Sequence, residues 1–280
     1  MKLRVRFRRD RRGLSPVISS VIITGTIVAL LTVVVIFANN FLWARIAESD
    51  FDAAKQFMQT VGLQIDDVAW VIGRTETARF SSRYGNVVLK PALNYTIYIN
   101  TTMQSNVKLY TNITNIICFN MPISQYTLGN GYFELIYPSA SNGFLLSGAS
   151  VPVAKIFAVE KVPMNDGSFV RVVAVPIIRM INLTIGDTNY VRLYLPVLLE
   201  GETIGRSQSV TLTGESISNF IIGGEEESVT AIKIEANFPL AGFDSSFFNF
   251  SQTLELIQAS EETILELYIG AVDVGLGVHL

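Results

Sequence analysis

Cysteine and histidine are almost missing from this sequence of 280 residues, which contains one of each, Cys118 and His279. A single cysteine allows no disulfide within the chain, and Cys118 in its apolar run is expected to be a core residue. A single histidine excludes a multi-histidine metal site and, at this position, a Ser-His-Asp triad. No glycine-rich phosphate loop is present. The sequence therefore predicts no enzyme, no metal and no cofactor. The one catalytic arrangement that sequence alone does not exclude is a pair of carboxylates that the fold brings together.

Charged residues are also scarce. They make up 16% of the sequence, against about 25% in ordinary globular domains, and the mean hydropathy is +0.39. Residues 1–12 hold seven of the 21 basic residues and one of the 24 acidic ones, so the remainder has 14 basic against 23 acidic residues and a net charge of −9. An acidic body argues against nucleic acid as a partner. The basic segment either binds anionic lipid or, as we favour, sets the orientation of a membrane span.

No charged residue occurs between Leu14 and Ala44. This run exceeds the ~20 residues needed to cross a bilayer and is longer than the apolar region of a secretory signal peptide. The positive-inside rule places the N-terminus in the cytoplasm and the rest of the chain outside. We therefore divide the chain into four parts. They are a basic leader peptide (1–13), a transmembrane helix (14–44), an extracellular extension of that helix (45–80) and a β-rich extracellular domain (81–280).

The junction between the basic segment and the apolar run reads RRGLSPVI over residues 11–18. Ser15 suits a helix N-cap and Pro16 the first helical position, so a helix would begin just after Gly13. Because glycine has no side chain, an extended leader can pass close to a protease at this point. The local residues are therefore compatible with a cut between Gly13 and Leu14. The alternative is an uncleaved signal anchor whose flank contains these residues by chance.

This junction resembles the class III signal peptide of archaeal type IV pilins, in which basic residues precede a glycine and an uncharged helix follows the cut. The resemblance covers only about residues 8–45. It implies that a membrane-bound prepilin-type peptidase cleaves after Gly13, and that the helices of many copies bundle in a filament. Bacterial type IV pilins have a glutamate at the fifth mature position, where this sequence has Ile18. The resemblance is therefore to the archaeal proteins.

An apolar stripe continues beyond the predicted membrane span. Its positions recur at steps of three and four, which is the heptad spacing of one helix face. The stripe consists of Ala47, Phe51, Ala54, Met58, Val61, Ile65, Val68 and Ile72. We expect one helix from Pro16 to about Ile72, with the stripe packed either on the chain's own domain or on another helix. Asp66 and Asp67 lie off the stripe and are expected to be solvated.

Beyond residue 84, short runs rich in β-branched and aromatic residues alternate with turn clusters. We expect strands at 95–99, 107–119, 131–137, 153–162, 168–185, 190–199, 207–215, 228–236 and 262–276. Asp166-Gly167 predicts a hairpin, residues 241–260 a loop and a short helix, and the acidic turn 225–227 a solvated loop. Regularly spaced short strands favour an antiparallel sandwich. The predicted fold class is α+β, with a long N-terminal transmembrane helix followed by an antiparallel β-sandwich-like domain.

Five Asn-x-Ser/Thr sequons lie in the part that the topology places outside the cell. They begin at Asn94, Asn100, Asn112, Asn182 and Asn249. Such sequons are acceptors for N-glycosylation on surface proteins. Because Asn, Ser and Thr are common in strands and turns, we expect one or two of the five to be occupied.

Two hypotheses from different classes follow. In the first, the chain is a major, minor or adhesive subunit of a type IV pilus-like surface filament, joined to other copies or other pilins through its N-terminal helix. Gly25 and Ala29 form the small-xxx-small pattern that lets helices approach closely. In the second, the chain is a single-pass, membrane-anchored extracellular binding domain that does not polymerise. Membrane lipid is a partner in both, and the mature N-terminus discriminates between them.

Overall fold

The computed structural model describes most of the chain after the basic segment. The described residues are 16–129, 131–139, 143–160, 168–203, 209–224, 227–239, 250–256 and 262–277. The chain forms two compact units, Met1–Ile46 and Ala47–Leu280. The predicted leader and cut site at 1–15, the hairpin at Asp166-Gly167, the sequon at Asn249 and His279 lie outside the described residues.

Helix α1 (Pro16–Ala69) is the one helix among the described residues. The sequence placed its end near Ile72 and assigned residues 45–80 to it, and both predictions are too long. After Ala69 the chain turns through Gly73, whose φ of +79° suits glycine at a helix end. The Gly73 amide donates to the carbonyl oxygen of Gly214 at 2.8 Å. The following residues then pair as a strand, and Ile72 is exposed rather than part of the buried stripe.

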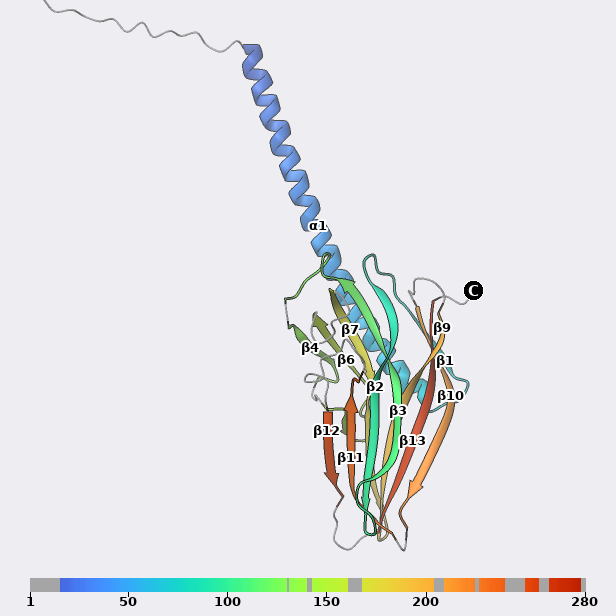
Figure 1. Cartoon of the computed structure of the whole chain (residues 1–280). Helices are drawn as coiled ribbons and strands as arrows, with labels where there is room; N and C mark the ends of the chain where they lie inside the picture. Colours follow the sequence, from blue (N-terminus) through green and yellow to red (C-terminus); the bar gives the residue numbers. More distant parts are fainter. Residues whose placement is uncertain are drawn as a thin grey trace, which may run out of the picture. The chain divides into compact units, whose positions relative to one another are not determined.

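The rest of the described chain is strand-rich (Figure 1). The strands are β1 (Thr75–Arg79), β2 (Asn86–Thr101), β3 (Val107–Pro122), β4 (Phe133–Tyr137), β5 (Leu145–Ser147), β6 (Ala154–Glu160), β7 (Phe169–Pro176), β8 (Ile178–Ile185), β9 (Thr188–Thr203), β10 (Ser209–Ile222), β11 (Val229–Asn237), β12 (Phe250–Glu255) and β13 (Glu262–Leu276).

These strands form two sheets. The six-stranded sheet has the order β1-β10-β13-β9-β8-β5, and the seven-stranded sheet has the order β12-β11-β2-β3-β7-β6-β4. The α+β class with a sandwich-like domain is confirmed. Pairing is mostly antiparallel, but β9 and β13 run parallel inside the six-stranded sheet, and so do β5 and β8. The domain is therefore antiparallel as expected, apart from these two parallel pairs.

Two local predictions differ from the structure. The run 168–185, expected as one strand, is divided between β7 and β8, which belong to different sheets. The division falls at Pro176, which has no N–H to donate to a ladder, and the next amide, Ile177, donates to the carbonyl of Val153 at 2.7 Å. Within 241–260, expected as a loop and short helix, residues 250–255 form strand β12.

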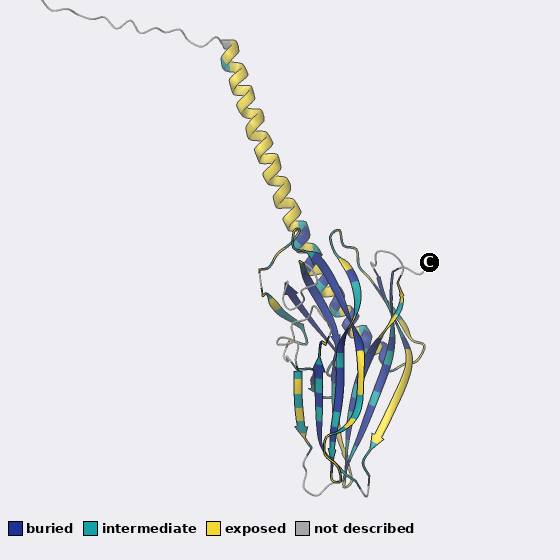
Figure 2. Cartoon of the chain, in the orientation of Figure 1, coloured by how far each residue is buried: buried dark blue, intermediate teal, exposed yellow. Residues whose placement is uncertain are grey.

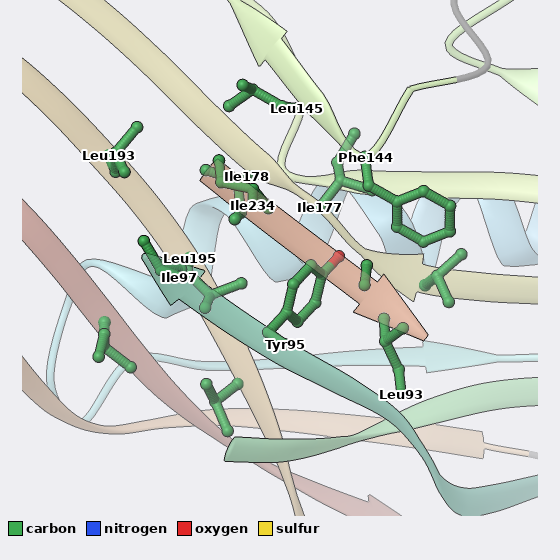
Figure 3. Close-up of a cluster of buried hydrophobic side chains, with 14 of the residues drawn as sticks. Leu93, Tyr95, Ile97, Phe144, Leu145, Ile177, Ile178, Leu193, Leu195 and Ile234 are labelled. Carbon is green, nitrogen blue, oxygen red and sulfur yellow. The ribbon is translucent and has the colours of Figure 1, made fainter. Parts of the chain in front are cut away.

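Two hydrophobic clusters form the core of the 47–280 unit. The first contains Tyr95, whose hydroxyl donates to the carbonyl of Pro176 at 2.6 Å, and Figure 3 shows it among Ile97, Ile177 and Leu195. The second contains the stripe of α1 with residues from both sheets. Strand β7 contributes alternate side chains to the two clusters, so it is buried on both faces. This explains why its sequence, apart from Arg171, is apolar at consecutive positions instead of alternating ones.

Candidate membrane and assembly surface

The first part of α1 has an exposed apolar surface on all sides. From Val17 to Trp43 its large apolar side chains are 45–72% exposed. The helix is long and apolar enough to cross a membrane, with a mean hydropathy of 2.8 in its most apolar window and no burial there. In Figure 2 this part of α1 is yellow, whereas the later turns show dark blue positions. Apolar surface of this extent requires lipid or protein to cover it.

The polar side chains of this segment are compatible with lipid because several are bonded within the helix. The hydroxyls of Ser20, Thr26 and Thr32 donate to carbonyl oxygens three or four residues earlier, at 2.8–2.9 Å. Side-chain groups satisfied in this way need no water from outside the helix. At the other end of the segment, the Arg45 guanidinium lies 5.3 Å from the centre of the Phe41 ring. A cation beside aromatic rings is typical of the headgroup region.

Gly25 and Ala29 are both exposed on this segment. A Cβ added to Gly25 would meet no atom within 4 Å outside the local helix backbone. The backbone is therefore open to close approach by another helix, as the small-xxx-small pattern predicts. Their use as a packing site stays a prediction.

The second part of α1 is embedded in the 47–280 unit. Seven of the eight predicted stripe positions, from Ala47 to Val68, are at most 1% exposed. A Cβ added to Gly62 would lie 2.8 Å from Cδ1 of Ile156 on β6, so the helix and the sheet are in close contact here. Of the two partners considered for the stripe, the structure shows the chain's own domain.

Polar contacts also hold this part of the helix. Asp66, expected to be solvated, accepts hydrogen bonds from the guanidinium of Arg179 on β8 at 3.0 Å and from the indole of Trp70 at 2.9 Å. The same guanidinium lies 5.1 Å from the ring centre of Tyr194 on β9. The prediction for Asp66 is therefore wrong, because the fold brings a distant arginine onto it. Asp67 is 62% exposed and lies 3.8 Å from Arg74.

A second ionic contact joins α1 to β4. The Lys55 ammonium lies 2.7 Å from a carboxylate oxygen of Glu134, which also accepts from the Tyr132 hydroxyl at 2.8 Å. Burial raises the pKa of Glu134, but its bonds to Lys55 and Tyr132 outweigh burial, and the net pKa is lowered. Burial lowers the pKa of Lys55, and the bond to Glu134 and its charge outweigh this, so the net pKa is raised.

Sequence reasoning did not single out the charged side chains that are buried in the sheets, among them Glu160, Arg171 and Lys155. Glu160 accepts from the Thr127 hydroxyl at 2.8 Å and from the backbone amides of Leu128 and Gly129, so it fixes the segment before β4. Arg171 donates to the side chain of Asn120 at 2.8 Å. Burial lowers the pKa of Lys155 to about 8. A signal was present, since each is a charge within a largely apolar strand, where a charge must find a partner.

The buried thiol of Cys118 has the core position expected for it, and burial raises its pKa to about 11. A thiol of this kind is mostly protonated at neutral pH and therefore unreactive. Within the described residues, no group of three or more His, Cys, Asp or Glu side chains could hold a metal ion. Glu225 and Glu226 of the acidic turn lie outside the described residues.

The described sequons differ in accessibility. Asn182 on β8 is exposed together with its partner Thr184. Asn112 is exposed, but the hydroxyl of Thr114 in its sequon is buried and accepts from the amide of Leu198 at 2.8 Å. Asn94 and Asn100 are half-buried in β2. Asn182 is therefore the best placed acceptor among the described sequons, and its occupancy stays a prediction.

Comparisons with protein-family models, with curated proteins and with solved structures found no significant match to this chain. The sequence and the geometry of α1 are therefore the features that bear on function.

Proposed function

We propose that this chain is a structural subunit of a type IV pilus-like surface filament. In this proposal a prepilin-type peptidase removes residues 1–13, cutting between Gly13 and Leu14. The helix first anchors the subunit in the membrane, with the acidic β-rich domain outside the cell. The same helix then joins other copies, or other pilins, in the filament. The proposed role is structural, with no catalytic step and no nucleic acid partner.

The observation that carries this proposal is the contrast within α1. Residues 47–68 of the stripe are buried in the chain's own domain, whereas residues 17–43 have no cover among the described residues. Burying apolar surface contributes roughly 25 cal/mol per Å². A helix that leaves the bilayer must therefore find another apolar partner, and the same segment of another copy has the matching apolar character. A head-to-tail contact that does not close produces a filament.

The alternative is a membrane-anchored extracellular binding domain that does not polymerise. One observation favours it. The outer stripe of α1 is already occupied by the chain's own sheets, so only the segment before Ala47 is left for helix–helix contacts. An anchored domain needs no more than this segment in lipid.

Two measurements on cells expressing the full chain separate these functions. Mass spectrometry of the mature N-terminus is expected to find Leu14 in the wild type and a retained leader in Gly13→Phe, because a bulky side chain blocks the cut. Shear fractionation is expected to release wild-type fibres and none from Gly13→Phe. A wild-type protein that keeps Met1 and never appears in sheared fibres would leave the anchored domain as the function.

A further inference from the structure

Strand β10 has neighbours on both sides only in its first part. Ser209–Thr213 pair with β1, whereas Ser216–Ile222 pair with β13 and with no other described strand. A β-bulge between Gly214 and Ser216 separates the two parts. Among the described strands, the second part is therefore a free edge of the six-stranded sheet, and its end is yellow in Figure 2. A free edge presents unpaired backbone N–H and C=O groups to any strand that reaches it.

This edge is long enough to pair with another strand, and its composition does not prevent pairing. Natural proteins protect edges with short strands, proline or charge. Residues 216–222 include no proline and no charged residue. The side chains of Ile217, Phe220 and Ile221 are 39%, 41% and 61% exposed. By contrast β5, at the other end of the same sheet, has three residues.

The sequence of the edge favours a second copy of itself as the partner. Backbone groups alternate in direction along a strand, so one edge pairs antiparallel with its own copy only in registers centred on a residue. The register centred on Asn219 places Ile217 opposite Ile221 of the second copy, twice by symmetry. It also places Phe220 opposite Ser218, which leaves room for the ring, and Ser216 opposite Ile222. Cross-strand aliphatic pairs of this kind are the stabilising unit of a sheet.

We propose that the free edge of β10 (216–222) pairs antiparallel with the same edge of a second copy, with the two Asn219 residues facing each other. The two six-stranded sheets then form one continuous sheet across the contact. An edge of seven residues is small beside the roughly 1,200–2,000 Å² of a stable interface. The contact is therefore weak and reversible, and it gains strength where many copies are displayed together.

The test uses the full chain in lipid nanodiscs that hold one copy each, so contacts between transmembrane helices do not contribute. Asn219→Cys is compared with Ser218→Cys, and Cys118 stays buried in both. Facing residues have Cα atoms about 4.5–5.5 Å apart, within the range that a disulfide needs. The two Ser218 residues are offset and exceed it. Under mild oxidation, Asn219→Cys is expected to give at least about fivefold more reducible dimer than Ser218→Cys.

A second experiment checks the register. Discs carrying Ile217→Cys mixed with discs carrying Ile221→Cys are expected to form the mixed dimer, while each variant alone does not. Equal dimer yields for Asn219→Cys and Ser218→Cys, or a dimer formed best through Phe220→Cys, would overturn the proposed pairing. Neither result bears on cleavage at Gly13 or on filament formation through α1, because each disc holds a single helix.

Discussion

The two parts of α1 belong to one continuous helix and have opposite surroundings. Between Val17 and Trp43 the large apolar side chains are 45–72% exposed, while the stripe from Ala47 to Val68 is at most 1% exposed. The difference follows from both the amount and the pattern of apolar side chains. The first part is apolar around its whole circumference, whereas the second has polar residues off the stripe. A helix with one apolar face is satisfied by its own domain, and a helix apolar on all sides needs cover from outside.

The largest expected effect comes from making the same Ile→Ala substitution in each part of α1 and comparing the losses of stability. Ile65→Ala removes a fully buried side chain and is expected to lower the free energy of unfolding by about 2–5 kcal/mol. Ile36→Ala, at a position 55% exposed, is expected to change it by less than about 0.5 kcal/mol. Denaturant unfolding of the detergent-solubilised chain, followed by circular dichroism, measures both. Equal losses would mean that the two parts do not differ in packing.

A second pair of variants uses adjacent aspartates on the embedded part of the helix. Asp66→Asn removes the charge that faces Arg179 and is expected to destabilise the domain by about 1.5–3 kcal/mol, as for hydrogen bonds to charged groups. Asp67→Asn, on an exposed side chain, is expected to change stability by less than about 0.5 kcal/mol. The same unfolding measurement compares them. Equal stability changes for the two variants would mean that Asp66 behaves as the solvated residue expected from the sequence.

The two glycines of α1 provide the third comparison. Gly62→Leu is expected to destabilise the domain by about 1–3 kcal/mol, because its Cβ alone would approach Ile156 to 2.8 Å in a filled core. Gly25→Leu meets open space and is expected to leave unfolding and membrane insertion unchanged. If the filament proposal holds, Gly25→Leu is expected to reduce the amount of sheared fibre instead. Normal fibres from Gly25→Leu would show that close packing at Gly25 is unnecessary.

Much of this architecture was predictable because it depends on periodicity. Of the eight stripe positions that the steps of three and four predicted, all but Ile72 are buried, and the run 262–276 was predicted with the bounds that β13 has. The helix end was missed because the pattern tolerates another turn, while Gly73 and the pairing of residues 75–79 with β10 end the helix earlier. That pairing joins residues far apart in the sequence.

Contacts between residues far apart in the sequence were not predictable, because local patterns do not indicate which distant residues the fold brings together. Nothing near Asp66 in the sequence indicates that Arg179 will face it, and nothing near Lys55 indicates Glu134. The parallel pairing of β9 with β13 depends on which strands become neighbours in the sheet. On the candidate surface, sequence reasoning located the exposed apolar segment. It could not decide the partner of the outer stripe, because both partners bury the same residues.

The smallest expected effect concerns the ion pair between Lys55 and Glu134. Removing this pair tests how much polar contacts contribute to the packing of the embedded part of α1. Glu134 is 39% exposed, so the pair is screened by water, and Glu134→Gln is expected to lower stability by only about 0.2–1 kcal/mol at neutral pH.

The pH dependence of this effect follows from the two pKa shifts. The pKa of Glu134 is lowered in the folded state, so its contribution to stability is present above the ordinary value of 4.5 and is lost as pH falls through the lower folded value. The pKa of Lys55 is raised, so its contribution is present below 10.5 and is lost as pH rises through the higher folded value. The stability difference between wild type and Glu134→Gln is therefore expected to be constant near neutral pH and to shrink in acid. Unfolding titrations of both proteins at several pH values measure this difference, and a difference that grows in acid would mean that the carboxylate is destabilising where it lies.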